Sequence, residues 1–124
     1  MNINELIEKA NKENITVTKN EANQVVLEIK DFKEAALLGS KNWGISHREE
    51  IFNAYIAKDE KQYFIFDFNK NIKDDNFLIG VTLDNNKNIK HAFNQDVRVV
   101  EEKDLPKAFI DSVMTKKLAR KFKP

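Results

Sequence analysis

The chain contains no cysteine, and this absence excludes several kinds of chemistry. Without a thiol there is no disulfide, no thiolate-ligated metal and no cysteine nucleophile. No apolar run in the sequence approaches the roughly 18 residues that a membrane-spanning helix needs. The N-terminus is polar and acidic, so it does not have the pattern of a signal peptide. We therefore expect a soluble, cytoplasmic protein with no membrane partner.

A strong net charge is also lacking, but the charge is unevenly distributed. The formal net charge is +1, with 21 basic and 20 acidic residues. Residues 112–124 contain no acid and five basic residues, Lys116, Lys117, Arg120, Lys121 and Lys123. Removing these 5 from the 21 leaves 16 basic residues against 20 acidic ones, so an acidic body is followed by a basic tail.

What is present is enough apolar sequence for one folded domain. The 124 residues are 41% hydrophobic and include nine phenylalanines, which argues for a packed core rather than disorder. No internal repeat or linker divides the chain. We predict a single domain, residues 1–124, with a basic C-terminal helix or tail at 112–124.

Hydrophobic periodicity and capping signals predict the order of the elements. Ser, Asp or Asn followed three residues later by Glu predicts helix starts at Asn2, Asp31 and Ser46. The predicted elements are a helix at 2–13, strands at 15–18 and 24–30, a helix at 31–38 with Gly39 as its C-cap, an extended segment at 42–45, a helix from 46, strands at 62–68, 77–83 and 89–93, an edge strand at 98–100, and a last helix capped by Asp104.

This order predicts an α+β fold in which helices pack on an antiparallel β-sheet. The strands of the second half are joined by short links, which is typical of a meander rather than of a parallel, doubly wound sheet. In the strand at 62–68 the alternation puts Phe64 and Phe66 on the core side and Asp67 on the outer side. Gly80 interrupts its strand and predicts either a bulge or a close backbone approach.

The segment 36–46 carries the only Trp and two of the three Gly. We predict that Trp43 is part of the core, because it lies between a helix end and a β-rich segment. The sequence Gly-Ser-Lys-Asn-Trp-Gly-Ile-Ser at 39–46 is followed by Phe-Asn-Ala-Tyr at 52–55 and by the strands at 64–67, 79–82 and 89–93.

Together these residues resemble a poorly characterised domain of bacteriophages and conjugative elements (PcfJ-like), over about residues 25–96. Its members carry a Gly-x-x-x-Trp-Cys-[Thr/Ile]-[Ser/Ala] stretch followed by Phe-x-x-Tyr, and Gly44 stands here in place of the Cys. The resemblance implies an origin in a phage or mobile element, and hence a location in the host-cell cytoplasm. It leaves open whether Gly44 marks a lost activity or a smaller core residue.

Candidate catalytic or metal-binding residues are few. His47 and His91 are the only histidines, and Asp67, Asp84 and Asp96 are the carboxylates nearest to the predicted sheet that could join them. Their spacing is ordinary, so we interpret both histidines as surface or hydrogen-bonded residues. The Gly-Ser-Lys at 39–41 lacks the remainder of a phosphate-binding loop. We therefore expect no cofactor and no metal.

The function that remains is binding. We expect a small, non-enzymatic protein of phage or mobile-element origin that binds a host protein, a nuclease or nucleoprotein complex, and inhibits it in the manner of an anti-CRISPR protein. A nucleic-acid-binding accessory protein and a degenerate enzyme homologue are the alternatives. The candidate binding residues are those of the basic tail, Lys116, Lys117, Arg120, Lys121 and Lys123, together with Lys41 and Asn42.

Overall fold

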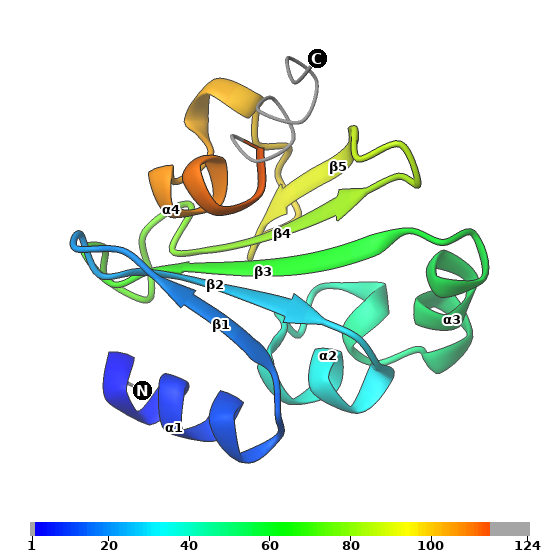
Figure 1. Cartoon of the computed structure of the whole chain (residues 1–124), viewed down its shortest axis with the longest axis horizontal. Coiled ribbons are helices and arrows are strands. Elements are labelled where there is room, and N and C mark those ends of the chain that lie inside the picture. The colour runs from blue at the N-terminus through cyan, green and yellow to red at the C-terminus, as the bar shows by residue number, and fades with distance from the viewer. Residues whose placement is uncertain (1, 115–124) are drawn as a thin grey trace, which may run out of the picture.

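A five-stranded antiparallel sheet runs through the centre of the protein, with helices on both of its faces (Figure 1). The computed structural model describes residues 2–114. The elements are α1 (Ile3–Lys12), β1 (Thr16–Lys19), β2 (Gln24–Ile29), α2 (Phe32–Leu38), the 3₁₀ turn η1 (Gly44–Ser46), α3 (Glu49–Ala57), β3 (Lys61–Asp67), β4 (Leu78–Leu83), β5 (Ile89–Asn94), the 3₁₀ turn η2 (Glu102–Asp104), α4 (Lys107–Phe109) and the π-helical turn η3 (Ile110–Met114).

The strands lie in sequence order, β1-β2-β3-β4-β5, so the predicted α+β class with an antiparallel meander is confirmed. Helices α1, α2 and α3 cover one face, which we call the first face, and α4 covers the second (Figure 1). None of the helices within residues 2–114 has the length and apolar character needed to cross a bilayer.

Of the three helix starts predicted from a Glu three residues after the cap, two are confirmed. The Oδ1 atom of Asn2 accepts a hydrogen bond of 2.9 Å from the backbone N–H of Glu5, and Asp31 does the same for Glu34. The third is wrong. Ser46 is buried in η1, whose backbone N–H groups turn back to Trp43 and Gly44, and α3 starts after Arg48 with no side-chain cap. The extended segment expected at 42–45 is therefore a tight turn instead.

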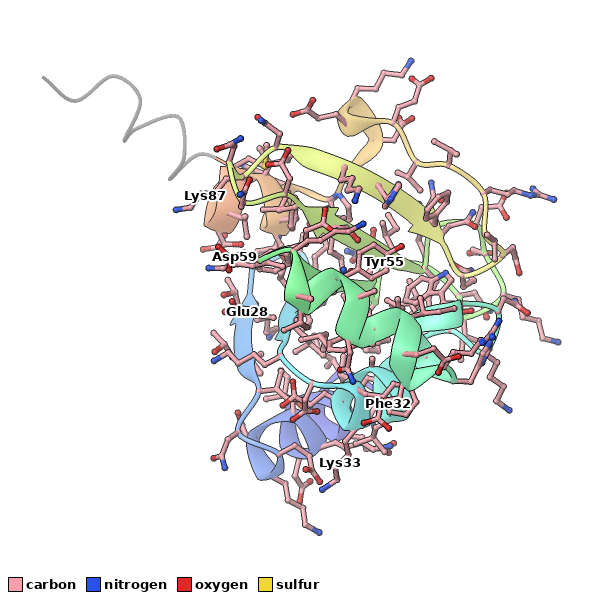
Figure 2. The ribbon with its side chains drawn as sticks, turned by 90° about the vertical axis from the view of Figure 1, so that its right-hand side faces the viewer. Glu28, Phe32, Lys33, Tyr55, Asp59 and Lys87 are labelled. Carbon is pink, nitrogen blue, oxygen red and sulfur yellow. The ribbon has the colours of Figure 1, made fainter. Side chains whose placement is uncertain are left out.

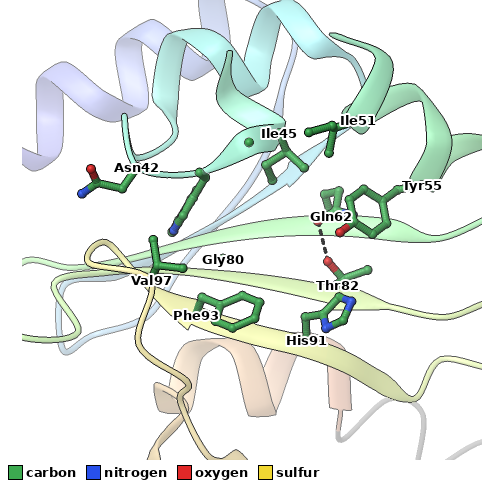
Figure 3. Close-up of a pocket in the computed structure, with 12 residues that line it drawn as sticks. Asn42, Ile45, Ile51, Tyr55, Gln62, Gly80, Thr82, His91, Phe93 and Val97 are labelled. Atoms are coloured by element: carbon green, nitrogen blue, oxygen red, sulfur yellow. Dashed lines mark hydrogen bonds between the residues drawn. The ribbon is translucent and has the colours of Figure 1, made fainter. Parts of the chain in front are cut away.

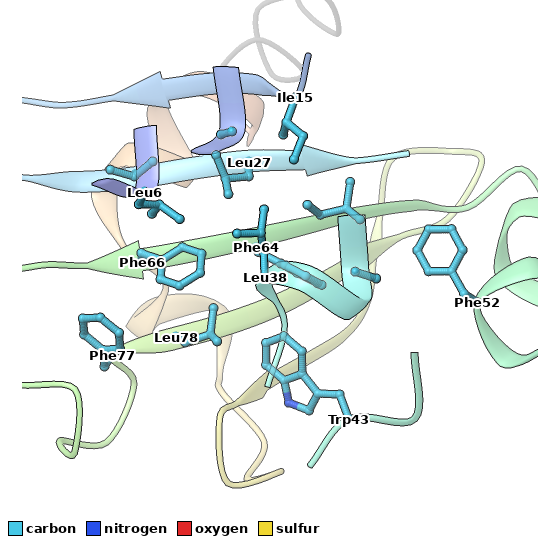
Figure 4. Close-up of a cluster of buried hydrophobic side chains, with 14 residues drawn as sticks. Leu6, Ile15, Leu27, Leu38, Trp43, Phe52, Phe64, Phe66, Phe77 and Leu78 are labelled. Carbon is cyan, nitrogen blue, oxygen red and sulfur yellow. The ribbon is translucent and has the colours of Figure 1, made fainter. Parts of the chain in front are cut away.

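The first face of the sheet carries the larger core (Figure 4). Alternate residues of β2, β3 and β4 meet α1, α2 and the segment before α3, and Trp43 packs on Phe64 with the ring centroids 5.1 Å apart. The buried members of this cluster that Figure 4 labels are Leu6, Ile15, Leu27, Leu38, Trp43, Phe52, Phe64, Phe66, Phe77 and Leu78. Trp43 is only 6% exposed, so its predicted place in the core is confirmed.

The second face of the sheet is also covered. The prediction that Asp67 faces outward is therefore wrong. Phe109 of α4 is fully buried against Ile65 and its neighbours, and Asp67 is 7% exposed. The Asp67 carboxylate accepts hydrogen bonds from the backbone and side chain of Asn69, each 3.1 Å long. On the same face, burial raises the pKa of Tyr63 to about 12, and the nearby carboxylate of Glu28 adds to this shift.

The end of the described chain differs from the prediction as well. Residues 98–100 form a single bridge, between Phe93 and Val99, rather than a strand. Asp104 lies in η2, and α4 begins after Pro106. Pro106 has no backbone N–H that the side chain of Asp104 could bind. Asp104 therefore does not cap the helix, and α4 starts at Lys107, directly after the proline.

Candidate functional site

A cavity of about 160 Å³ lies on the first face, between the turn before α3 and the strands β3, β4 and β5 (Figure 3). Its walls are mostly apolar and aromatic and include Trp43. Figure 3 shows Ile45 and Ile51 across the cavity from Phe93. Figure 2 looks onto this side of the molecule, where α3 crosses in front of the strands and carries Tyr55. A recess of this kind is the usual form of a binding site.

Three polar side chains form the floor of the cavity at one end. The register of the sheet pairs Gln62 of β3 with Thr82 of β4, and Thr82 with His91 of β5. Residues paired in this way point to the same face, so Gln62, Thr82 and His91 form a row across three strands. Sequence reasoning missed this row, because it becomes visible only when the strands are placed in register.

The row contains an unsatisfied donor. The hydroxyl of Thr82 donates a 2.7 Å hydrogen bond to Oε1 of Gln62. Gln62 is 1% exposed, and its Nε2 has no hydrogen-bond partner within residues 2–114. A buried donor without a partner costs about 1–3 kcal/mol. Because Nε2 is itself buried, a ligand in the cavity can restore the missing bond once a neighbouring side chain of the wall moves aside.

His91 is held by aromatic contacts. Its ring stacks on Phe93 at a centroid distance of 5.8 Å and meets the edge of Tyr55 at 6.3 Å. The other histidine, His47, is exposed and does not line the cavity. Asp67, Asp84 and Asp96 do not line it either. In the part of the chain that the structure describes, no three His, Asp or Glu side chains gather in a way that could hold a metal ion.

Two glycines make room for this arrangement. A Cβ atom at Gly80 would lie 3.0–3.3 Å from three ring carbons of Trp43, so Gly80 marks a close approach and the bulge lies instead between Thr82 and Leu83. Gly44 is also part of the cavity wall. A Cβ there would contact the Cδ1 atom of Ile51 at 3.1 Å.

Three loops meet beside the cavity, and Gln95 ties them together. Its backbone carbonyl accepts hydrogen bonds from the hydroxyl of Ser40 at 2.7 Å and from Nδ2 of Asn42 at 3.0 Å. Its side-chain amide donates to the backbone carbonyl of Asp74. We call the exposed side of residues 40–43, 69–76 and 95–99 the three-loop surface.

Three large apolar side chains are exposed on the three-loop surface, among its charged and polar residues. Ile72 is 61% exposed, Val97 49% and Val99 75%, and these are three of the five large hydrophobic residues that are exposed within residues 2–114. Val97 also has a φ of 64°, a conformation that a β-branched side chain rarely adopts. Backbone strain of this kind is common at functional sites.

The predicted binding residues fall into two groups. Lys41 and Asn42 belong to the three-loop surface, where Lys41 is exposed and Asn42 bonds to Gln95 as described above. The basic residues Lys116, Lys117, Arg120, Lys121 and Lys123 lie outside the described residues, so the electropositive tail stays a prediction.

Comparison of the chain with family models, with curated proteins and with solved structures gave no match.

Proposed function

We propose that this protein is a small, non-enzymatic binding protein that acts by engaging a host protein through the three-loop surface. The observation that carries this proposal is that Ile72, Val97 and Val99 are each exposed on two loops that Gln95 joins. Ordered surface loops commonly carry binding residues, and apolar side chains exposed on them favour a protein partner. Inhibition of a defence nuclease, as by anti-CRISPR proteins, is the form of this activity that the resemblance to a mobile-element domain favours.

Ordered loops also suit tight binding for an energetic reason. Association costs free energy whenever flexible side chains and loops must be immobilised. Here Gln95 binds loop 40–43 through its backbone carbonyl and loop 69–76 through its side-chain amide. The side chain of Asn94 fixes loop 95–99 by accepting hydrogen bonds from the backbone N–H groups of Asp96 and Arg98, of 2.9 and 3.0 Å. The surface is therefore largely organised before a partner arrives.

Replacing the three apolar residues tests this proposal. In the variant Ile72→Asn, Val97→Asn, Val99→Thr, we expect capture of the host partner from nuclease-treated lysate to fall at least about tenfold, because buried apolar anchors dominate binding energy. Asn tolerates a positive φ better than Val, so position 97 should fold without added strain. Capture is measured by quantitative mass spectrometry.

The matched control is Leu37→Gln, Ile56→Gln, which removes the other two exposed large hydrophobics, on α2 and α3. It should capture the partner as well as the original protein does. Equal capture by the three-loop variant and the original would refute the proposal. If capture disappears on nuclease treatment, the protein is instead a nucleic-acid-binding accessory protein, as the basic tail suggests.

A second candidate, a degenerate homologue of an enzyme, is favoured by one observation. Gly44 lines the same cavity as His91, so a Cys at this position would stand in a recess with an imidazole. An imidazole in the same recess can accept the proton of a thiol and so make it reactive. If the resembled domain uses its Cys in this way, Gly44 is the position at which the activity was lost.

Restoring the thiol tests the second candidate. Because the chain has no other Cys, a thiol reagent such as DTNB reports on one site only. We expect Gly44→Cys to react at least about tenfold faster near pH 6.5 than Asn85→Cys, which lies on an exposed turn. A rate equal to or below that of Asn85→Cys would show that the cavity does not activate a thiol.

A further inference from the structure

We propose that the cavity beneath α3 is a binding site for a small, uncharged, planar molecule that carries a lactam or carboxamide edge. This proposal does not depend on the three-loop surface, because it is based on the side chains that line the cavity and on their hydrogen bonds. It would stand if the protein partner proved to bind elsewhere.

The volume limits the size of the ligand. A cavity of about 160 Å³ is close to the ~150 Å³ that accommodates a benzene molecule in an apolar protein interior. The occupant is therefore about one six-membered ring with one or two substituents. A larger molecule would have to extend through the opening past Val97 and Asn42.

The hydrogen-bonding pattern selects the chemistry of the ligand. Thr82 uses its hydroxyl hydrogen to bond Oε1 of Gln62, which leaves Nε2 of Gln62 as a free donor and Oγ1 of Thr82 as an acceptor. A donor beside an acceptor is complementary to an adjacent C=O and N–H, as in a lactam or a primary amide. Turning the Gln62 amide over would leave its oxygen unpaired instead, so one amide atom lacks a partner in either orientation.

The other walls favour a flat and neutral ligand. Trp43, Tyr55 and Phe93 present rings to the cavity, and aromatic faces pack well on planar groups. No Lys, Arg, Asp or Glu of the described chain lines the cavity. His91 is the one side chain of the lining that can carry a positive charge, so a charged ligand would lose its hydration there without gaining a permanent counter-charge, which is costly.

The single Trp makes occupancy measurable by NMR. Trp43 lines the cavity and donates its indole N–H to the carbonyl of Asn94 at 2.9 Å, so its one indole resonance reports on the site. We expect 2-pyridone, a lactam of suitable size, to shift this resonance in a saturable way. N-methyl-2-pyridone, which lacks the N–H, should bind about tenfold more weakly, since it leaves the acceptor unpaired.

A substitution separates specific binding from simple filling of the cavity. The Gln62→Leu variant should bind 2-pyridone at least about tenfold more weakly than the original protein. The NMR spectrum of the variant should remain that of a folded protein. Gln24→Leu is the matched control, because the amide of Gln24 bonds Asn20, Asp67 and Ala108 away from the cavity. Gln24→Leu should leave the affinity unchanged.

The ligands alone decide the question if a variant fails to fold. Uracil carries the same lactam edge and should also bind. Uridine 5′-monophosphate should bind no more tightly than uracil. That result would identify the ligand type as a free base rather than a nucleotide. Tighter binding of the nucleotide would overturn the assignment to an uncharged molecule. Absence of a saturable shift with 2-pyridone and uracil, or equal binding of 2-pyridone and its N-methyl derivative, would overturn the proposal altogether.

Discussion

Trp43→Ala is expected to lower the free energy of unfolding by about 3–5 kcal/mol, the usual cost of removing a large buried aromatic side chain. The indole connects three parts of the structure. It packs on Phe64 of β3, covers Gly80 of β4, and donates its N–H to Asn94 at 2.9 Å. Chemical denaturation followed by circular dichroism measures the change, and a thermal midpoint lower by roughly 12–20 °C should accompany it.

The control for this experiment is Trp43→Phe, which keeps a ring over Gly80 but removes the indole N–H. It should cost less than the Ala variant, because most of the apolar contact survives. If Trp43→Ala leaves stability unchanged while binding of the partner is lost, Trp43 is a surface contact and its assignment to the core is wrong. We expect Trp43→Ala to lower both stability and partner binding, because Trp43 bonds to Asn94, and Asn94 organises the three-loop surface.

The sequence predictions are more accurate for interactions between residues close together in the chain than for interactions between residues far apart. The caps at Asn2 and Asp31 depend on residues three positions apart, and both are present in the structure. The alternation in residues 62–68 correctly gives β3 and its phenylalanine face. Alternation cannot say whether the opposite face is covered, and α4 covers it, which is why Asp67 is buried.

Ser46 shows how a correct local signal can lose to packing. Its spacing to Glu49 is that of a capping box, but the burial of Trp43 draws the chain into a tight turn at Gly44–Ser46. The hydroxyl of Ser46 is left buried and has no hydrogen-bond partner among the residues that the structure describes. The local pattern therefore failed because a tertiary contact with a larger free energy competed with it.

The cavity could not have been predicted because its polar row depends on register. Gln62, Thr82 and His91 lie up to 29 positions apart and come together only through strand pairing. The one available signal was a polar residue at a core-facing position in each of three strands. Lys41 and Asn42, two of the candidate binding residues from the sequence, belong to the three-loop surface. The hydrogen bonds of Gln95 to Ser40, Asn42 and Asp74 hold the other two loops beside residues 40–43, and they join residues 21 to 55 positions apart in the sequence.

Gly39→Ala is expected to be the second most harmful of these substitutions, at about 3 kcal/mol, the upper end of the cost of overpacking a core. Gly39 is the C-cap of α2, as predicted, but its φ is −82°, so it is not required for a left-handed conformation. The structure needs a glycine there for space. A Cβ would lie 2.7 Å from the backbone carbonyl oxygen of Ala35 and would overlap the hydroxyl of Ser46.

A double-mutant cycle distinguishes this steric account from a conformational one. Ser46→Gly removes the overlapping hydroxyl, so in the Gly39→Ala background it should recover at least about 1 kcal/mol, a coupling typical of residues in contact. Recovery should be incomplete, since the carbonyl of Ala35 belongs to the backbone and cannot move away. Gly44→Ala is the matched control: its Cβ meets only the flexible end of Ile51, at 3.1 Å, and it should cost much less. Additive effects of Gly39→Ala and Ser46→Gly, measured by denaturant unfolding, would show that the two residues do not compete for the same space.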